Sequence, residues 1–380
     1  MTQKQLFSIL AALLLGFGAA AQHGENSGMG GPDGNYTSLY EWISGHEKKM
    51  DSFNLYLNTG WGLHVTDDGK GAFAADNIRL EVKGIIGDHL GYRLRYHMNR
   101  PTAALPYDKL PSAMDIFIVS WRFNEHYLIQ AGKIFQAWGG FEYDENPIFV
   151  YRYSDFSGAT DCFTSGASFS WFPAASHELQ LSVTNSYTVP LDMRYPAFAS
   201  AQLKEAKLPW SYILNWNGQL FNGLVSTRWG AGRMVFAEDQ YTDRITLGTR
   251  LNLPKLSWYV DLIGSYETVD YTAFGVKELG TLEKDMYYMT MLTKADWHFA
   301  PKWNLASQFT LEGASCTSFP DYRKKWGALC SLEYYPEPSQ DFRVFLAGFL
   351  DGCSYSSATG LQPWTTHSVE LGFIYRIKAF

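Results

Sequence analysis

The chain has 380 residues and a formal net charge of −7, with 46% hydrophobic, 16% aromatic and only 18% charged residues. No apolar run of about 18 residues follows position 21, which excludes a bundle of transmembrane helices. The plentiful aromatic and β-branched residues exclude intrinsic disorder, and the acidic balance gives no support to nucleic-acid binding. These facts leave a large β-rich protein that is either secreted or placed in an outer membrane.

The N-terminal residues have the three parts of a secretory signal peptide. Lys4 supplies a positive charge, residues 6–18 are an apolar stretch too short to span a bilayer, and residues 19–21 are three alanines before Gln22. This pattern predicts a signal peptide over 1–21. The Gly-rich, polar residues that follow predict a flexible N-terminal arm over 22–50.

From residue 51 onwards, apolar and polar residues alternate with a period of two. Leu80 and Val82, for example, lie between Arg79, Glu81 and Lys83. Successive strand residues face opposite sides of a sheet, so each such segment has one apolar and one polar face. Sixteen segments are expected, starting near residues 51, 73, 89, 113, 126, 161, 176, 209, 222, 242, 255, 284, 302, 323, 340 and 365.

The connections between these segments alternate between short and long. Tight turns are expected near residues 87–88, 124–125, 173–174, 222–223, 254–255, 300–301 and 336–337. Longer connections are expected near residues 66–72, 100–112, 138–160, 188–208, 236–241, 270–283, 313–322 and 353–364. Tight turns at one end and long loops at the other are typical of an outer-membrane barrel, whose periplasmic turns are short.

Aromatic residues gather near the expected strand ends, as at Trp121, Tyr127, Trp297 and Trp303. Tyr and Trp favour the membrane interface, where an apolar ring and a polar tip are both accommodated. We therefore expect residues 51–380 to form a transmembrane antiparallel β-barrel of 16 strands in the outer membrane of a Gram-negative bacterium, surrounded by lipid. The terminal Phe380 resembles the assembly signal of such barrels.

Barrel size favours a pore. About sixteen strands enclose a water-filled lumen unless a domain plugs it, and the arm over 22–50 is too short for a large plug. The third long connection, 137–160, is expected to fold inward and narrow the lumen, although it could instead be an outward surface loop. Its acidic residues are Glu142, Asp144, Glu145 and Asp155, and Arg152 is basic.

The polar faces of the second and third strands supply Arg79, Lys83, Arg93, Arg95 and His97. Facing lipid near the midplane, each Arg or Lys would cost about 2–4 kcal/mol, so these side chains are expected to face the lumen. A basic strip opposite an acidic loop would create a transverse field that selects solutes. The alternative is a generally wetted wall with no selectivity.

Several runs resemble the Bacteroidetes branch of the phosphate-selective porin O and P family. They lie at residues 77–84, 92–96 and 131–133, and at 139–142 and 146–156. The resemblance implies a trimeric porin that passes small hydrophilic solutes and anions. On this basis the candidate anion contacts are Arg79, Lys83, Arg93, Arg95, Lys133 and Arg152. The acidic balance of this chain departs from phosphate-selective members, whose pores are rich in Lys and Arg.

Other motifs are few. Cys316 and Cys353 fall in the expected last two outer loops, where a disulfide is one hypothesis. No zinc spacing and no hydrolase or nucleotide-binding motif is present, so we expect no cofactor, no metal and no enzyme. Two alternatives to a diffusion channel stay open: a closed barrel with a binding or structural role, such as an adhesin or secretion accessory, and an outer-membrane hydrolase.

Overall fold

The computed structural model describes residues 53–337 and 341–379. The expected signal peptide, N-terminal arm and Phe380 lie outside this part of the chain. The described residues form 17 strands in one antiparallel sheet. The strands are β1 (Asn54–Thr66), β2 (Gly71–Ala75), β3 (Arg79–Ile86), β4 (Leu90–His97), β5 (Met114–Arg122), β6 (Tyr127–Phe135), β7 (Phe163–Ala174), β8 (His177–Asn185), β9 (Trp210–Leu220), β10 (Val225–Ala237), β11 (Gln240–Leu253), β12 (Leu256–Val269), β13 (Lys284–Ala300), β14 (Trp303–Ser315), β15 (Arg323–Tyr334), β16 (Phe342–Tyr355) and β17 (Trp364–Lys378).

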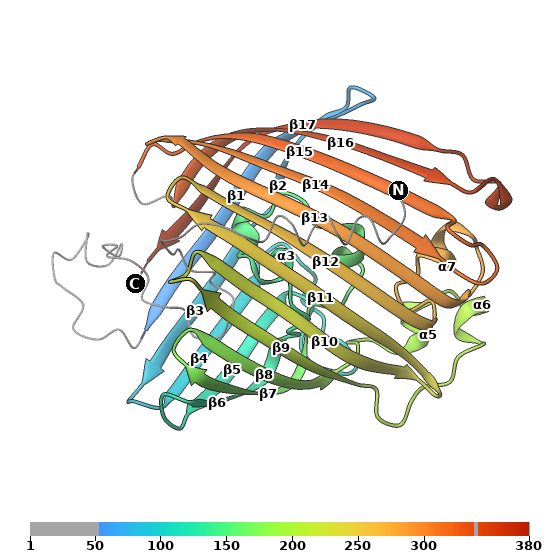
Figure 1. Cartoon of the computed structure of the whole chain (residues 1–380), viewed down its shortest axis with the longest axis horizontal. Helices are drawn as coiled ribbons and strands as arrows, with labels where there is room; N and C mark the ends of the chain where they lie inside the picture. The colour runs from blue at the N-terminus through green and yellow to red at the C-terminus, as the bar shows by residue number, and fades with distance from the viewer. Residues whose placement is uncertain (1–52, 338–340, 380) are drawn as a thin grey trace.

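The sheet closes on itself between its first and last strands. β1 pairs with β17 along one edge and with both β2 and β3 along the other. Because β2 and β3 pair with successive halves of β1, they occupy a single position in the ring. The fold is therefore a closed barrel of 16 strand positions, and the expected fold class is confirmed (Figure 1).

The strands begin within a few residues of the expected positions, and tight turns join them at one end of the barrel. For the connection near residues 236–241, the expectation of a longer loop is wrong. Only two residues separate Ala237, the end of β10, from Gln240, the start of β11. Asp239 has a φ of 58° there. A positive φ is typical of the two-residue turns that match the twist of paired strands.

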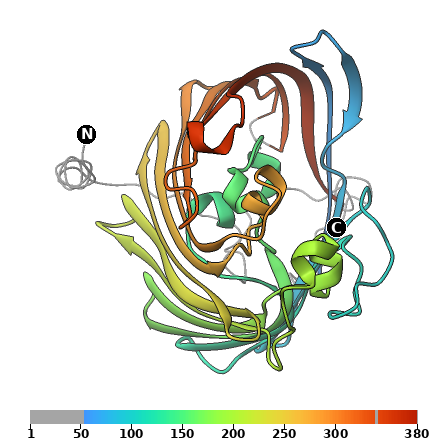
Figure 2. The same cartoon turned by 90° about the vertical axis from the view of Figure 1, so that its right-hand side faces the viewer.

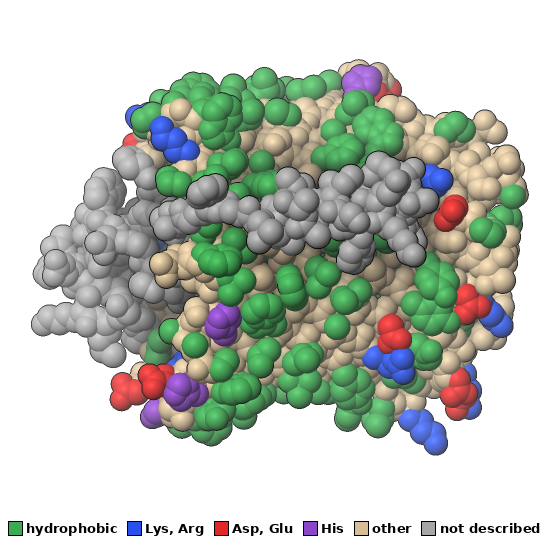
Figure 3. Space-filling view, in the orientation of Figure 1, with side chains coloured by type: hydrophobic (Ala, Val, Ile, Leu, Met, Phe, Trp, Pro, Cys, Tyr) green, Lys and Arg blue, Asp and Glu red, His purple; other side chains and the backbone are tan. Residues whose placement is uncertain are grey.

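Side chains alternate between the two faces of the wall. On β17, Val369, Leu371, Phe373 and Tyr375 are exposed on the outside, in the expected register. Figure 3 shows hydrophobic side chains over the middle of the barrel and charged side chains mostly towards its two ends. Within residues 53–337 and 341–379, no helix combines the length and apolar character needed to cross a membrane.

The helices are short and belong to the connections at the outer end. They are α3 (Phe141–Asp144), α4 (Asp155–Gly158), α5 (Leu191–Arg194), α6 (Ala197–Ser200) and α7 (Phe274–Glu278), with 3-10 turns η1 (Pro147–Phe149) and η2 (Ser357–Thr359). Seen from the end that carries the long loops, α3 and α4 lie inside the ring of strands (Figure 2).

Candidate functional site

The connection between β6 and β7, residues 136–162, lies inside the barrel, and we call it the inner loop. All four residues of α3 are buried, and Trp138 is only 1% exposed. The loop contacts mainly the inward face of the wall from β10 to β16. Gln136 at its start also donates a hydrogen bond to Thr184 of β8, and Asn77 donates one to the Pro147 carbonyl. The loop therefore covers chiefly the β10–β16 side of the lumen.

The loop backbone lies directly against two wall strands, β10 and β11. Gly139 and Gly140 both have a φ of 85°, which glycine adopts without strain. The Gly140 N–H donates to the Arg228 carbonyl at 2.9 Å. A Cβ on Gly230 of β10 would lie 2.4 Å from the Trp138 carbonyl oxygen, so the absence of a side chain at this wall position permits the close approach.

Two wall carboxylates bind the free N–H groups at the starts of the loop helices. Asp261 of β12 accepts hydrogen bonds from the first two N–H groups of α3 at 2.9 and 2.8 Å. Glu312 of β14 does the same for α4 at 3.2 and 3.1 Å. The first N–H groups of a helix have no partner within it, so these acids satisfy them and hold both helices against the wall.

Most acidic side chains of the inner loop are neutralised by the wall behind them. Their partners lie on β10, β13 and β15, and are Arg228 for Asp144 (2.9 Å), Lys294 for Glu145 (2.9 Å), and both Arg323 and Lys325 for Asp155. The loop acids therefore bind the wall from β10 to β15, rather than directing their charge at the basic strip on β3 and β4.

Glu142 has a different environment, because its partners lie within the loop. Its carboxylate accepts hydrogen bonds from the Ser154 N–H and from the hydroxyls of Ser154 and Ser157, the last two at 2.7 and 2.6 Å. The side chain is 1% exposed. Burial raises the pKa of the Glu142 carboxyl to about 7 against these hydrogen bonds, which lower it.

This environment predicts that the docked loop loses stability as the pH rises from 4.5, the ordinary pKa of Glu, to about 7. Across that window the folded protein binds more protons than the unfolded chain, so stability falls with rising pH; below it the contribution is fully present. We expect the melting temperature of the wild type, measured in detergent, to fall relative to that of Glu142→Gln across the window. Parallel curves for the two proteins would contradict the assignment.

The return half of the loop crosses to β15 and β16. Arg343 of β16, 1% exposed, donates to the Ile148 carbonyl and lies 3.3 Å from Glu333. Arg152 forms an ion pair with Asp351 of β16. This candidate anion contact thus lies against the same wall as the loop acids.

The basic strip divides into two groups. Arg79 and Arg95 face inward but are 7% and 2% exposed. Together with His97 they surround one carboxylate, Asp115 of β5, at 3.6, 3.3 and 3.0 Å. This group carries more positive than negative charge, but its side chains are buried.

Arg93 and Lys83 border the space that the inner loop leaves free. Arg93 Nε donates to Glu81 Oε1 at 2.7 Å. One open space lies between loop residues 137–144 and the inward faces of β4, β5, β6, β8, β9 and β10. A second space adjoins it, lined by Tyr56, Glu81, Lys83, Arg93, Asn146 and Arg376. Arg93 borders both spaces.

Lys133 lies away from the lumen. It pairs across the sheet with Phe117, which is exposed on the outside. Its ammonium lies 3.2 Å from Asp108 in the β4–β5 connection, and both side chains are almost fully buried. The structure therefore places this candidate anion contact beneath an outer connection.

The cysteines form no disulfide: all four are free. Cys353 lies within β16, and Cys316 lies in the β14–β15 connection with its Sγ 3.6 Å from Glu283 Oε2. The disulfide hypothesis is wrong because both thiols are free, and Cys353 lies within a strand rather than in an outer loop.

The partners of the inner loop were missed by sequence reasoning. These partners all lie at inward positions of their strands: Arg228, Lys294, Arg323 and Arg343. The alternation of residues along each strand could have shown that they face the lumen. Their roles depend on which loop they face, which strand alternation does not specify.

Comparison with solved structures gives outer-membrane proteins, channels and porins among them, at low sequence identity. The outer membrane channel DcaP of Acinetobacter baumannii matches at 11% identity and a TM-score of 0.58, covering 85% of this chain and 96% of that one. An anion-selective porin from Comamonas acidovorans matches at 12% and 0.55, covering 86% and 99%. OmpT of Vibrio cholerae, in a trimer form, matches at 10% and 0.56, also covering 86% and 99%. A comparison with curated proteins gave no significant match.

The family comparison agrees with the barrel and with the resemblance found in the sequence. A profile of the family described as phosphate-selective porin O and P matches residues 53–377, which is nearly the whole barrel. Together with the closed sheet of 16 strand positions, it identifies an outer-membrane porin channel of a Gram-negative bacterium. The chain belongs to the phosphate-selective porin O and P family.

Proposed function

We propose that this porin is a passive diffusion channel that prefers small anions, and that its narrowest part lies between the inner loop and the wall that runs from β17 through β1 and β3 to β10. One observation supports the preference for anions. The two adjoining spaces are lined by four cationic side chains, Lys83, Arg93, Arg228 and Arg376, and by two acidic ones, Glu81 and Asp144. An excess of fixed positive charge in a narrow passage concentrates anions.

The placement of the candidate residues supports different roles for them. Lys83 and Arg93 border the passage and would meet solutes directly. Arg79 and Arg95, buried around Asp115, would add positive potential from behind the surface. The acids of the inner loop support the preference indirectly, because their pairing with the opposite wall removes most of their charge from the passage.

The arrangement supports a channel rather than an enzyme. Glu142 accepts hydrogen bonds from two serines within the loop, and Asp144, Glu145 and Asp155 are held in ion pairs. Side chains engaged in this way hold a loop in place and are poorly suited to attack a substrate. We further propose a homotrimer, supported by the trimer form of the Vibrio cholerae relative.

The test is single-channel recording of the mature protein in a planar bilayer under a KCl gradient. We expect stable steps, in groups of three equal levels, and a reversal potential whose sign shows a preference for chloride. A potassium preference would contradict the anion proposal, and single steps would contradict the trimer. A folded but silent barrel would favour a binding or structural role.

A further inference from the structure

A second cluster of charged side chains lies where the barrel closes, away from the inner loop. His64 of β1 and Glu370 of β17 are directly opposite each other in the register of the closing strands. Both face the lumen, because Val369 and Leu371, the neighbours of Glu370, are exposed on the outside. His64 is only two residues from the outer end of β1, so the cluster lies towards the outer mouth.

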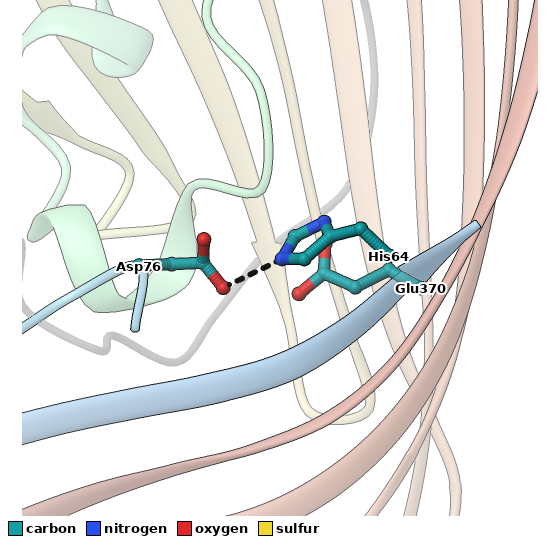
Figure 4. Close-up of side chains that lie close together, drawn as sticks. All are labelled: His64, Asp76 and Glu370. Atoms are coloured by element: carbon teal, nitrogen blue, oxygen red, sulfur yellow. Dashed lines mark hydrogen bonds and ion pairs between the residues drawn. The ribbon is translucent and has the colours of Figure 1, made fainter. Parts of the chain in front are cut away.

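The third member, Asp76, is brought in by an irregularity between β2 and β3. Ala75 pairs with Trp61 and Arg79 pairs with Asn58, so three residues, 76–78, lie opposite two on β1. The Asp76 N–H donates to the Gly60 carbonyl at 3.0 Å. One extra residue in a strand is a β-bulge, which re-aims side chains, and here Asp76 points at the His64 ring (Figure 4).

The three side chains converge. His64 Nε2 lies 3.0 Å from Asp76 Oδ2, and Nδ1 lies 3.7 Å from Glu370 Oε2. One nitrogen or oxygen of each residue can be chosen so that all three lie within 4.8 Å of one another. A Cβ on Gly62 would lie 2.8 Å from Glu370 Oε1, so the glycine leaves the space that this carboxylate occupies.

The cluster has an excess of negative charge. Across residues 53–337 and 341–379, no Lys or Arg forms an ion pair with Asp76 or Glu370, and no group donates a hydrogen bond to Glu370, although it is only 8% exposed. The lumen acids Asp115 and Glu333, by contrast, both have arginine partners. A buried carboxylate without a compensating partner is costly, so a cation at this place would be stabilising.

We propose that His64, Asp76 and Glu370 form a binding site for a divalent first-row metal ion of the zinc class. One imidazole nitrogen and two carboxylates suit such ions, and three protein ligands with an open position for water form a common zinc arrangement. The ligand atoms would draw together by about 1 Å from their present separation to reach bonds of about 2.1 Å. His64 and Asp76 are partly exposed, so an ion can reach them from the lumen.

Binding would also join three segments of the chain. The ligands come from the first strand, from the bulge between β2 and β3, and from the last strand. An ion that binds only the folded barrel raises its stability. Zinc is therefore expected to raise the melting temperature of the wild-type protein as well as to bind to it.

The test is calorimetric titration of the mature protein, folded in detergent and carrying no histidine tag, with ZnCl₂. We expect one zinc ion per chain, and an affinity lower by at least about tenfold in His64→Ala and in Glu370→Gln, because loss of even an indirect ligand contact has effects of this size. His367→Ala is the matched control, since His367 is an exposed histidine on β17; it should leave the affinity unchanged.

Asp76→Asn keeps the shape of the bulge and gives an independent variant if another fails to fold. Wild-type protein that conducts but binds no zinc stoichiometrically, or an unchanged affinity in the folded ligand variants, would overturn the site. Conductance is measured separately on each protein, so failure of the metal site and failure of the anion channel give different results.

Discussion

Gly230→Val should release the inner loop from the wall and increase the single-channel conductance by at least about twofold, since a barrel of sixteen strands without an inner segment holds a wide aqueous lumen. The new side chain would meet the Trp138 carbonyl, which lies 2.4 Å from the position of a Cβ on Gly230. Valine itself favours strands, so the barrel should still fold. The measurement is bilayer recording of the variant beside the wild type.

Gly348→Val is the control for this result. Gly348 lies on β16 in an outward position, and a Cβ there meets nothing within 4 Å. Its conductance should equal that of the wild type. If Gly230→Val folds and conducts like the wild type, the inner loop does not set the size of the channel.

Arg93→Gln should reduce the chloride preference by roughly fivefold, because a unit charge about 4 Å from a passing ion changes its energy by about 1 kcal/mol even in bulk water. Arg93 borders both spaces, and its loss also leaves the negative charge of Glu81 without its 2.7 Å partner. The permeability ratio is obtained from the reversal potential under a KCl gradient.

Two further variants test whether this effect depends on the position of the charge in the passage. Arg93→Gln combined with Glu81→Gln removes one charge of each sign and should return the reversal potential towards the wild-type value. Arg233→Gln removes a positive charge from an exposed side chain that pairs with Asp243, and should change nothing. An equal shift in Arg233→Gln would show that selectivity follows overall charge rather than the passage.

The barrel could be predicted from local patterns. The alternation of Leu80 and Val82 with Arg79 and Lys83 established both a strand and its inward face, because side chains on a strand alternate sides with a period of two. The tight turns, such as the one at Gly87, marked where strands reverse. These signals depend only on neighbouring residues, so the start of nearly every strand could be read from the chain.

The candidate site could be predicted only in part. The sequence indicated that Arg93 and Arg95 face inward, but not that Arg95 is buried around Asp115 while Arg93 borders the passage. For Lys133 the inference failed to find its partner, Asp108, which is brought over it by an outer connection. The alternation of residues along a strand shows which face of the sheet a side chain lies on. Whether that side chain is exposed depends on the loop that covers it.

The sequence by itself thus predicted a β-barrel, most of its turns and the inward face of the strands that alternate clearly, since these follow from local alternation and turn residues. Only the tertiary structure decided that Asp144 meets Arg228, 84 residues away along the chain, and that His64 meets Glu370 across the closing strands. The physical reason is that contacts across a lumen depend on strand register, barrel closure and the path of the inner loop. All three are non-local properties of the folded chain.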